Sequence, residues 1–227
     1  YIPAGSKLIL NICSPLELPN NVLKRNDIQK VIYTYESPNI RHQKQWDLEF
    51  LLPTFNNILT YWNPLLEINN YVPNKIDYLP FIGRFDMSNP NDLSFIIENN
   101  NNHKNICIIL ENRNIKDNYY INGIKLNAQD YLRLEYSIEL GKRIYCYGSS
   151  WEPYKNIINY CPSTNRNLDI EFVVDIMKQY TFCLIIENCN AQGYVSEKIY
   201  DALTVGCIPL YYGNNNALLG IPTDCYI

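Results

Sequence analysis

A polar turn between an apolar run and a helix carries the residues of this sequence that are best suited to chemistry. The run 182–186 ends abruptly in Glu187-Asn188, and the predicted helix that follows opens with Ser196-Glu197-Lys198. Ser196 can cap this helix, and Glu197 suits the positive end of its dipole. Lys198 does not suit that end, because a cation in the first turn is disfavoured unless an anion is held there. Backbone N–H groups, the dipole and a lysine ammonium can bind a phosphate together, so the segment predicts a phosphate site.

The same segment is also compatible with an ordinary amphipathic helix. In that interpretation Glu197 and Lys198 form a solvated surface pair, and Ile199, Ala202 and Leu203 make the buried face. Spacing alone supports both interpretations equally, so the choice depends on the rest of the chain.

Regular elements surround this segment in the second half of the chain. Short apolar runs typical of buried strands occupy residues 106–110, 143–147, 182–186 and 208–212. Apolar spacing predicts helices over residues 128–140, 168–180 and 195–205. Strands that alternate with helices predict a parallel sheet, in which ligands bind beyond the carboxyl ends of the strands.

The first half of the chain is less regular. Apolar runs at residues 7–12 and 31–35 predict two buried strands, whereas prolines divide residues 45–85 into loops with short strands. The polar, low-complexity run 98–105 marks a boundary. We therefore expect an N-terminal lobe over residues 1–97, an Asn-rich linker over 98–105 and a C-terminal lobe over 106–227. Because the first residue is Tyr1 rather than Met, we expect a truncated piece of a longer protein with an incomplete N-terminal lobe.

Composition excludes several classes of protein. The net charge of −4 argues against a nucleic-acid partner, which would need a basic face. Eight cysteines without a CxxC pair, and only two histidines, make a zinc site improbable. No apolar stretch reaches the about 20 residues that span a bilayer, so we expect no membrane anchor in this chain. No Asn lies in an Asn-X-Ser/Thr sequon, which favours a protein outside the secretory pathway.

The stretch 182–213 resembles the signature of the α1,3-fucosyltransferases, glycosyltransferase family 10. That signature runs Phe-x-Leu-x-Phe-Glu-Asn, a short loop, Tyr-(Ile/Val)-Thr-Glu-Lys, an apolar helix, Gly, a Pro-containing strand and Gly. The matching positions are Phe182, Leu184, Glu187, Asn188, Tyr194, Val195, Glu197, Lys198, Ala202, Gly206, Pro209 and Gly213. Ser196 replaces threonine. Matches in this number and order are specific, unlike a lone short motif.

Shorter segments resemble the same family in the same order. They are Tyr35–Asn39, Phe55–Tyr61, Ile76–Gly83, Asn112, Arg133 with Tyr136 and Leu140, and Tyr145–Gly148. The sequence departs from the family at Trp62-Asn63-Pro64, where Arg-Arg-Asp is common, and at Glu111, where a serine is expected. An insertion also lies between Asn112 and Arg133. These departures concern the acceptor side and the first loop of the C-terminal lobe.

The resemblance implies an α/β fold of the GT-B type, in which two Rossmann-like lobes face a cleft. It implies an α-(1,3)-fucosyltransferase that moves L-fucose from GDP-fucose, with inversion, to a hydroxyl of a glycan or glycoconjugate acceptor, usually O3 of GlcNAc. It also implies that no cofactor is required and that a divalent metal is at most stimulatory. The sequence contains no Asp-x-Asp metal motif.

The resemblance gives roles to eight residues. Glu36, after a predicted strand, is the expected general base. The expected donor-binding residues are Asn112, Arg133, Glu187, Asn188, Tyr194, Glu197 and Lys198. Arg133 and Lys198 would neutralise the leaving diphosphate, and Glu197 would accept hydrogen bonds from ribose hydroxyls. Without the resemblance, Arg133 would be a solvated helix residue and Glu36 a turn cap.

Two alternatives stay open at this point. The first is a GT-B transferase that uses another nucleotide sugar, because sugar identity depends on few contacts. The second is a non-catalytic module that binds a GDP-sugar or a glycan. Hydrolysis of different donors distinguishes the first, and binding without turnover distinguishes the second.

Overall fold

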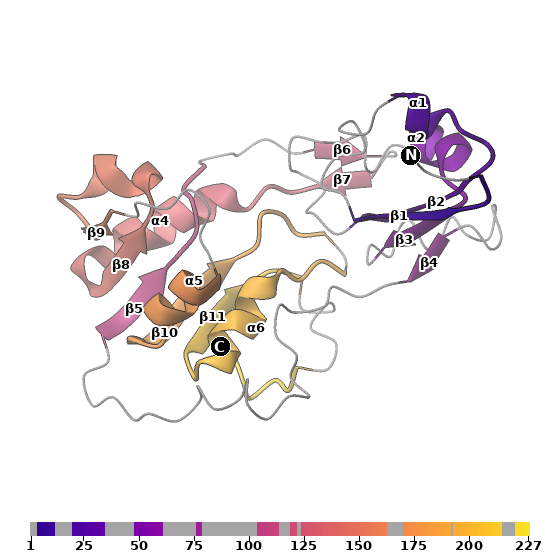
Figure 1. Cartoon of the computed structure of the whole chain (residues 1–227). Coiled ribbons are helices and arrows are strands. Elements are labelled where there is room, and N and C mark those ends of the chain that lie inside the picture. Colours follow the sequence, from indigo (N-terminus) through magenta and orange to yellow (C-terminus); the bar gives the residue numbers. More distant parts are fainter. Residues whose placement is uncertain are drawn as a thin grey trace.

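The computed structural model describes two separate parallel sheets, each with its own helices, and a small hairpin (Figure 1). The predicted α/β class, with two parallel sheets as in a GT-B fold, is thereby confirmed. The described residues are 4–11, 20–34, 48–60, 76–78, 104–113, 119–121, 124–162, 170–191, 193–214 and 221–227. Within these ranges, no helix is both long and apolar enough for a membrane crossing.

The N-terminal sheet has four parallel strands in the order β1-β2-β3-β4. Their bounds are β1 Lys7–Asn11, β2 Gln29–Thr34, β3 Asn57–Thr60 and β4 Ile76–Tyr78. Two short helices, α1 (Asn20–Leu23) and α2 (Leu48–Thr54), belong to the same part of the chain. Ile32 and Ile58 are fully buried and pair across β2 and β3, so these middle strands carry the core.

The C-terminal sheet has five parallel strands in the order β11-β10-β5-β8-β9. Their bounds are β5 Lys104–Ile108, β8 Ile144–Tyr147, β9 Asn159–Cys161, β10 Tyr180–Ile186 and β11 Ile208–Tyr212. The helices are α4 Asp130–Leu140, α5 Ile170–Met177 and α6 Glu197–Thr204, with short 3₁₀ helices η5 Gly141–Arg143 and η6 Ser149–Tyr154. In order of appearance this is the 3-2-1-4-5 strand order of doubly wound nucleotide-binding sheets.

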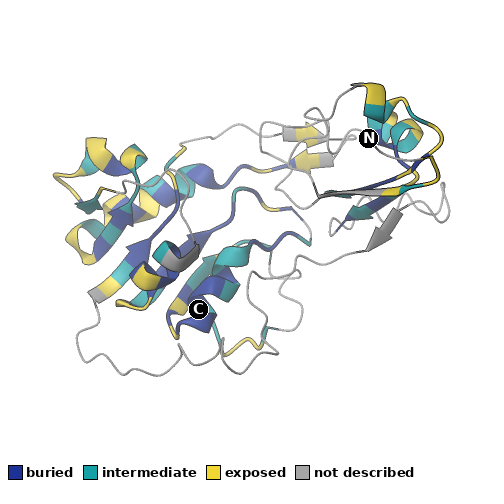
Figure 2. Ribbon diagram, in the orientation of Figure 1, coloured by how far each residue is buried: buried dark blue, intermediate teal, exposed yellow. Residues whose placement is uncertain are grey.

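Both faces of this sheet are covered, which explains why its central strand β10 is apolar at nearly every position. Along β10, Cys183 and Ile185 lie in one cluster with residues of α5 and α6. Leu184 and Ile186 lie in the other cluster, against which leucines of α4 and Trp151 of η6 pack. Figure 2 shows the buried residues concentrated in the central strands and on the inner sides of these helices.

Several elements differ from the sequence expectations. Strands β6 (Tyr119–Ile121) and β7 (Ile124–Leu126) pair in an antiparallel way inside the segment that we treated as an insertion. Helix α2 contains Pro53, although prolines predicted only loops and short strands there. Strand β5 begins at Lys104, inside the run 98–105 that we expected to be a linker. The predicted domain boundaries themselves stay a prediction.

The outer edge of β11 is paired by the last residue of the chain. The Ile227 N–H donates to the Pro209 carbonyl at 2.9 Å, and the Tyr211 N–H donates to the Ile227 carbonyl at 2.8 Å. The rings of Tyr211 and Tyr226 also pack edge to face with centroids 6.2 Å apart. This pairing satisfies backbone groups on the edge of β11 that faces away from β10, whereas β11 itself pairs in parallel with β10.

Candidate functional site

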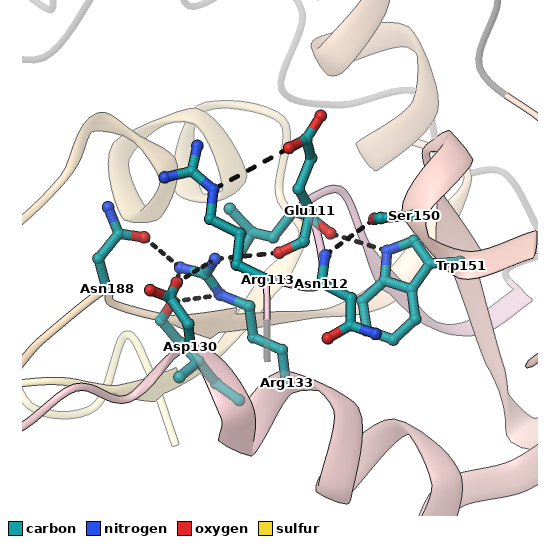
Figure 3. Close-up of polar contacts among 10 residues, drawn as sticks. Glu111, Asn112, Arg113, Asp130, Arg133, Ser150, Trp151 and Asn188 are labelled. Atoms are coloured by element: carbon teal, nitrogen blue, oxygen red, sulfur yellow. Dashed lines mark hydrogen bonds and ion pairs between the residues drawn. The ribbon is translucent and has the colours of Figure 1, made fainter. Parts of the chain in front are cut away.

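The candidate site lies at the carboxyl ends of β5 and β10, the neighbouring strands at which the strand order reverses. The chain continues from β5 to β8 and β9 on one side, and later returns on the other side as β10 and β11. Open α/β sheets bind ligands at such a reversal. Residues 109–113 follow β5 and residues 187–191 follow β10, so two polar segments that are distant in sequence meet here (Figure 3).

Arg133 of α4 connects these two strand ends (Figure 3). Its Nε and Nη2 donate to the Ile186 carbonyl at 3.1 and 2.8 Å. Its Nη1 donates to the Glu111 carbonyl at 3.1 Å and lies 2.6 Å from the Asp130 carboxylate. Its Nη2 also donates to the Asn188 side-chain oxygen at 2.5 Å. Each guanidinium nitrogen therefore has a protein oxygen as its partner.

This arginine is a buried cross-link rather than the solvated helix residue that its spacing alone suggested. Its side chain is 3% exposed and that of Asp130 is 1% exposed. Burial lowers the pKa of Arg133, and the negative charges of Asp130 and Glu187 oppose that shift. All donors of Arg133 are engaged with protein oxygens in this structure. Its direct contact with the donor diphosphate stays a prediction.

The loop after β5 is held from the other side by η6. The Trp151 side chain is fully buried, and its Nε1 donates to the Leu110 carbonyl at 2.8 Å. The Asn112 N–H donates to Ser150 Oγ at 2.9 Å. The buried Asn112 Oδ1, by contrast, has no hydrogen-bond partner among the described residues. An unsatisfied buried acceptor costs about 1–3 kcal/mol, so this oxygen is ready to receive a donor from a ligand.

Glu187 holds the start of α6. Its carboxylate is buried, with the residue 2% exposed, and its Oε1 accepts hydrogen bonds from the Ser196 N–H at 2.8 Å and from Ser196 Oγ at 3.0 Å. Ser196 is the N-cap residue, but its hydroxyl donates to Glu187 and does not cap its own helix, contrary to our expectation. Burial raises the pKa of Glu187, whereas the charge of Lys198 and the bonds from Ser196 lower it.

A glycine makes room for this carboxylate at the end of β11. A Cβ placed on Gly213 would lie 2.4 Å from Tyr211 Oη and 2.8 Å from Glu187 Cγ. Both distances are far shorter than a carbon can tolerate, so the packing of Glu187 requires glycine here. The Glu187 N–H also donates to the Tyr212 carbonyl at 2.9 Å, which joins the ends of β10 and β11.

The first turn of α6 presents the predicted cation. Lys198 Nζ lies 2.9 Å from Glu197 Oε1, and these side chains are 28% and 16% exposed. Tyr194, just before the helix, is 5% exposed, and its N–H donates to the Ala191 carbonyl at 3.0 Å. The charges of Glu187 and Tyr194 raise the pKa of Arg133, and the charge of Lys198 lowers the pKa of Glu187. The residues around the two strand ends thus form one electrostatically connected group.

A match to a known protein family covers the part of the chain that holds most of the candidate site. The family model "Glycosyltransferase family 10 (fucosyltransferase) C-term" matches residues 127–227, which contain α4, β10 and α6. This segment belongs to glycosyltransferase family 10. The resemblance noted in the sequence is therefore confirmed over residues 127–227.

Relatives of this family 10 segment are fucosyltransferases by name. An α-(1,4)-fucosyltransferase of Arabidopsis thaliana is 41% identical over 51 residues, which are 22% of this chain and 13% of that protein. The GDP-fucose protein O-fucosyltransferase 3 of Danio rerio is 34% identical over 57 residues, which are 25% of this chain and 12% of that protein. The alignments thus span about an eighth of each relative. A crystal structure of an α1,3-fucosyltransferase aligns with 92% of this chain and 56% of its own, at 16% identity and a TM-score of 0.42.

Seven of the eight predicted site residues lie in the described part of the chain, and the family 10 segment holds six of them. Asn112 lies in the segment after β5, and the other six follow β10, lie on α4 or begin α6. Glu36, the predicted general base, lies outside the described residues. The sequence analysis missed Asp130, although it precedes Arg133 by three residues and so faces it on the helix.

Proposed function

We propose that this chain is the donor-binding lobe, with part of the acceptor-binding lobe, of an enzyme that transfers L-fucose from GDP-fucose to a hydroxyl group. The observation that carries the proposal is Lys198 at the start of α6, beside a reversal of strand order, within a family 10 segment. A helix start and a lysine ammonium together suit a diphosphate. The relatives named above support fucose as the sugar and GDP as the nucleotide.

The leaving diphosphate is the group that this site must stabilise. As the bond from the sugar C1 to the phosphate oxygen breaks, negative charge grows on the GDP that departs. Lys198 would donate to it, while Tyr194 and Asn188 line its position. Arg133 would keep Asn188 and the Glu111 carbonyl in place and add positive charge behind them. Preorganised donors of this kind typically contribute about 3 kcal/mol each to a transition state.

The nucleoside would occupy the remaining polar groups. Glu197 is partly exposed beside Lys198, so its carboxylate can accept hydrogen bonds from ribose hydroxyls. Asn112 offers the unpartnered Oδ1 described above. Glu187 would act indirectly, by holding Ser196 and thereby the start of α6. We further propose that this chemistry needs no bound metal, because the cations take over the neutralisation of charge.

The acceptor side of the proposal depends on Glu36. Its carboxylate would take the proton of the acceptor hydroxyl as the new bond to C1 forms on the face opposite the diphosphate, which inverts the configuration of C1. The proposed acceptor is a glycan, at O3 of GlcNAc. A second candidate is a protein hydroxyl, because several relatives are named protein O-fucosyltransferases. Incubation of labelled GDP-fucose with a GlcNAc-terminated glycan and with an unglycosylated protein separates the two.

The donor assignment has a direct test. Isothermal titration of the chain with GDP, UDP, GDP-fucose and GDP-mannose should show tight binding only with guanosine diphosphates, and preference for fucose over mannose. Lys198→Ala should weaken GDP binding about 10-fold, because it removes a charge-assisted hydrogen bond. Equal binding of GDP and UDP would contradict the assignment. Binding of GDP-fucose without turnover, by the longer protein as well, would support a non-catalytic module.

A further inference from the structure

A pocket of about 490 Å³ lies where the start of α4 meets the loop after β10 and the end of β11. This volume falls within the range of about 300–1,000 Å³ that is typical of small-molecule sites. The described residues that line the pocket include none of the predicted donor-binding residues. Its polar lining consists of Asn127, Gln129, Tyr131, Asn190 and Tyr212.

Backbone hydrogen bonds attach the walls of this pocket to the loop that carries Asn188. The Gln129 N–H donates to the Asn188 carbonyl at 2.9 Å, and the Asn190 N–H donates to the Asn127 carbonyl at 3.1 Å. The side chain of Asn188 itself accepts from Arg133, as Figure 3 shows. A ligand in the pocket would therefore lie next to the loop that is predicted to bind the donor, without displacing any of its contacts.

Gln129 gives the pocket a buried acceptor that the protein does not use. The residue is 6% exposed, and its Oε1 has no hydrogen-bond partner among the described residues. Gln129 is also the N-cap residue of α4, yet its side chain makes no capping hydrogen bond. A buried acceptor without a partner costs about 1–3 kcal/mol. The side chain therefore does not stabilise the helix start, and its oxygen can accept a hydrogen bond from a ligand.

The chemistry of the lining favours a neutral ligand. Phosphates and carboxylates are recognised by arginine and lysine, and none of the described lining residues is charged. The amides of Asn127, Gln129 and Asn190 can both donate and accept hydrogen bonds, which suits hydroxyl groups. Tyr131 and Tyr212 add aromatic rings, and Tyr212 is 45% exposed, so its ring is available for apolar contact. Hydroxyl groups beside an apolar C–H face are the features of a sugar ring.

We propose that this pocket is a subsite for a neutral sugar ring, with Gln129 and Tyr212 as its specificity-determining residues. The inference rests on the proposed function, since it places the sugar beside the loop that binds the nucleoside diphosphate. Two sugars can reach this position, the fucosyl group of the donor and a sugar unit of a glycan acceptor. Gln129 accepts a hydrogen bond from a sugar hydroxyl, and the ring of Tyr212 packs against the C–H face.

The test separates sugar binding from nucleotide binding in the whole chain. Isothermal titration gives the affinities for GDP and GDP-fucose, and a saturation-transfer NMR titration in the presence of GDP gives that for the GlcNAc disaccharide N,N′-diacetylchitobiose. Gln129→Leu and Tyr212→Ala should each weaken binding of one of the two sugar ligands about 3- to 10-fold, because one neutral hydrogen bond or one aromatic contact is lost. GDP binding should stay within about 2-fold.

Matched control variants lie away from the pocket. Gln179→Leu removes an exposed amide that donates to the Asp175 carbonyl, and Tyr136→Ala removes a ring that is 40% exposed on α4. Both should leave all three affinities within about 2-fold. Gln129→Leu should also leave the unfolding midpoint in urea unchanged or raised, since the lost amide oxygen has no partner among the described residues.

The pattern of losses identifies the sugar. A loss confined to the disaccharide supports a subsite for the acceptor, and a loss confined to GDP-fucose supports a subsite for the fucosyl group. Unchanged affinities for both sugar ligands in both variants would overturn the inference and leave the proposed function intact. An equal loss for GDP would also overturn it, because it would indicate a general effect on the loop. If the wild-type chain bound neither GDP nor GDP-fucose, the proposed function itself would fail.

Discussion

Replacing Arg133 by methionine tests the claim that this side chain joins the two central strands. Methionine keeps much of the apolar stem but removes the contacts to the carbonyls of Glu111 and Ile186, and it leaves the 1%-exposed Asp130 carboxylate buried without its cation. Removing one partner of a buried ion pair costs about 3–5 kcal/mol. For a chain of this size each kcal/mol lowers the unfolding midpoint by about 2–4 °C, so the expected loss is about 6–20 °C.

Equilibrium unfolding in urea, followed by circular dichroism, measures the loss of unfolding free energy. Arg113→Met is the matched control, because the Arg113–Glu111 pair is exposed at 4.0 Å and should contribute at most about 1 kcal/mol. A double variant that also replaces Asp130 by leucine should be more stable than Arg133→Met alone, since it removes the stranded charge. A loss below about 1 kcal/mol in Arg133→Met would show that the guanidinium does not hold the strand ends together.

Two further predictions concern the packing and charge around Glu187. Gly213→Ala should destabilise the fold by roughly 1–3 kcal/mol, because the new Cβ would meet the Tyr211 hydroxyl at 2.4 Å. Gly5→Ala is the control, since nothing lies within 4 Å of its Cβ and the variant reports only the cost of a positive φ. Urea unfolding compares the two variants, and an unchanged unfolding free energy in Gly213→Ala would contradict the close packing. The folded-state pKa of Glu187 is raised by burial above the ordinary value of 4.5, so the folded protein holds this proton more tightly, and this group's contribution to stability should grow as the pH falls toward 4.5. Glu187→Gln should remove that contribution. The unfolding free energies of the wild type and of this variant are measured at several pH values between 5 and 7. A difference, wild type minus variant, that rose with pH would refute the reasoning.

The regular part of the C-terminal lobe was predictable from sequence because its patterns are strong. Apolar runs located β8, β10 and β11 within a few residues, and apolar spacing over residues 128–140 located α4. The family signature also lies within residues 127–227, which the family 10 model matches. Local pattern and tertiary packing agree in these elements, so the sequence carried enough information.

The missed elements had signals that were weak or overlooked. Asn122-Gly123 lies between two apolar runs, which is the strongest short hairpin signal, and β6 and β7 pair around it. Helix α2 was excluded by Pro53, yet Leu51 and Phe55 are buried there, so packing outweighs the local preference. Strand β9 has only three residues and owes its existence to pairing with β8.

The inner structure of the site could not be predicted in the same way. The partners of Arg133 include carbonyl groups 22 and 53 residues away, and a carbonyl carries no sequence signal. The role of Glu187 likewise depends on Ser196 and on the absence of a side chain at Gly213. Sequence indicates which residues matter in this region, whereas their division between ligand contact and support depends on the folded geometry.

The buried cysteines of this lobe can report whether its central strands have separated. None of the seven cysteines that the structure describes forms a disulfide, and five are buried, namely Cys107, Cys146, Cys183, Cys189 and Cys207. Cys107 and Cys183 are paired across β5 and β10, beneath the strand-order reversal, and burial raises the pKa of Cys107 well above its usual value. The Cys107 thiol is thus shielded and held protonated while β5 and β10 stay together, and it becomes accessible to thiol reagents when those strands part.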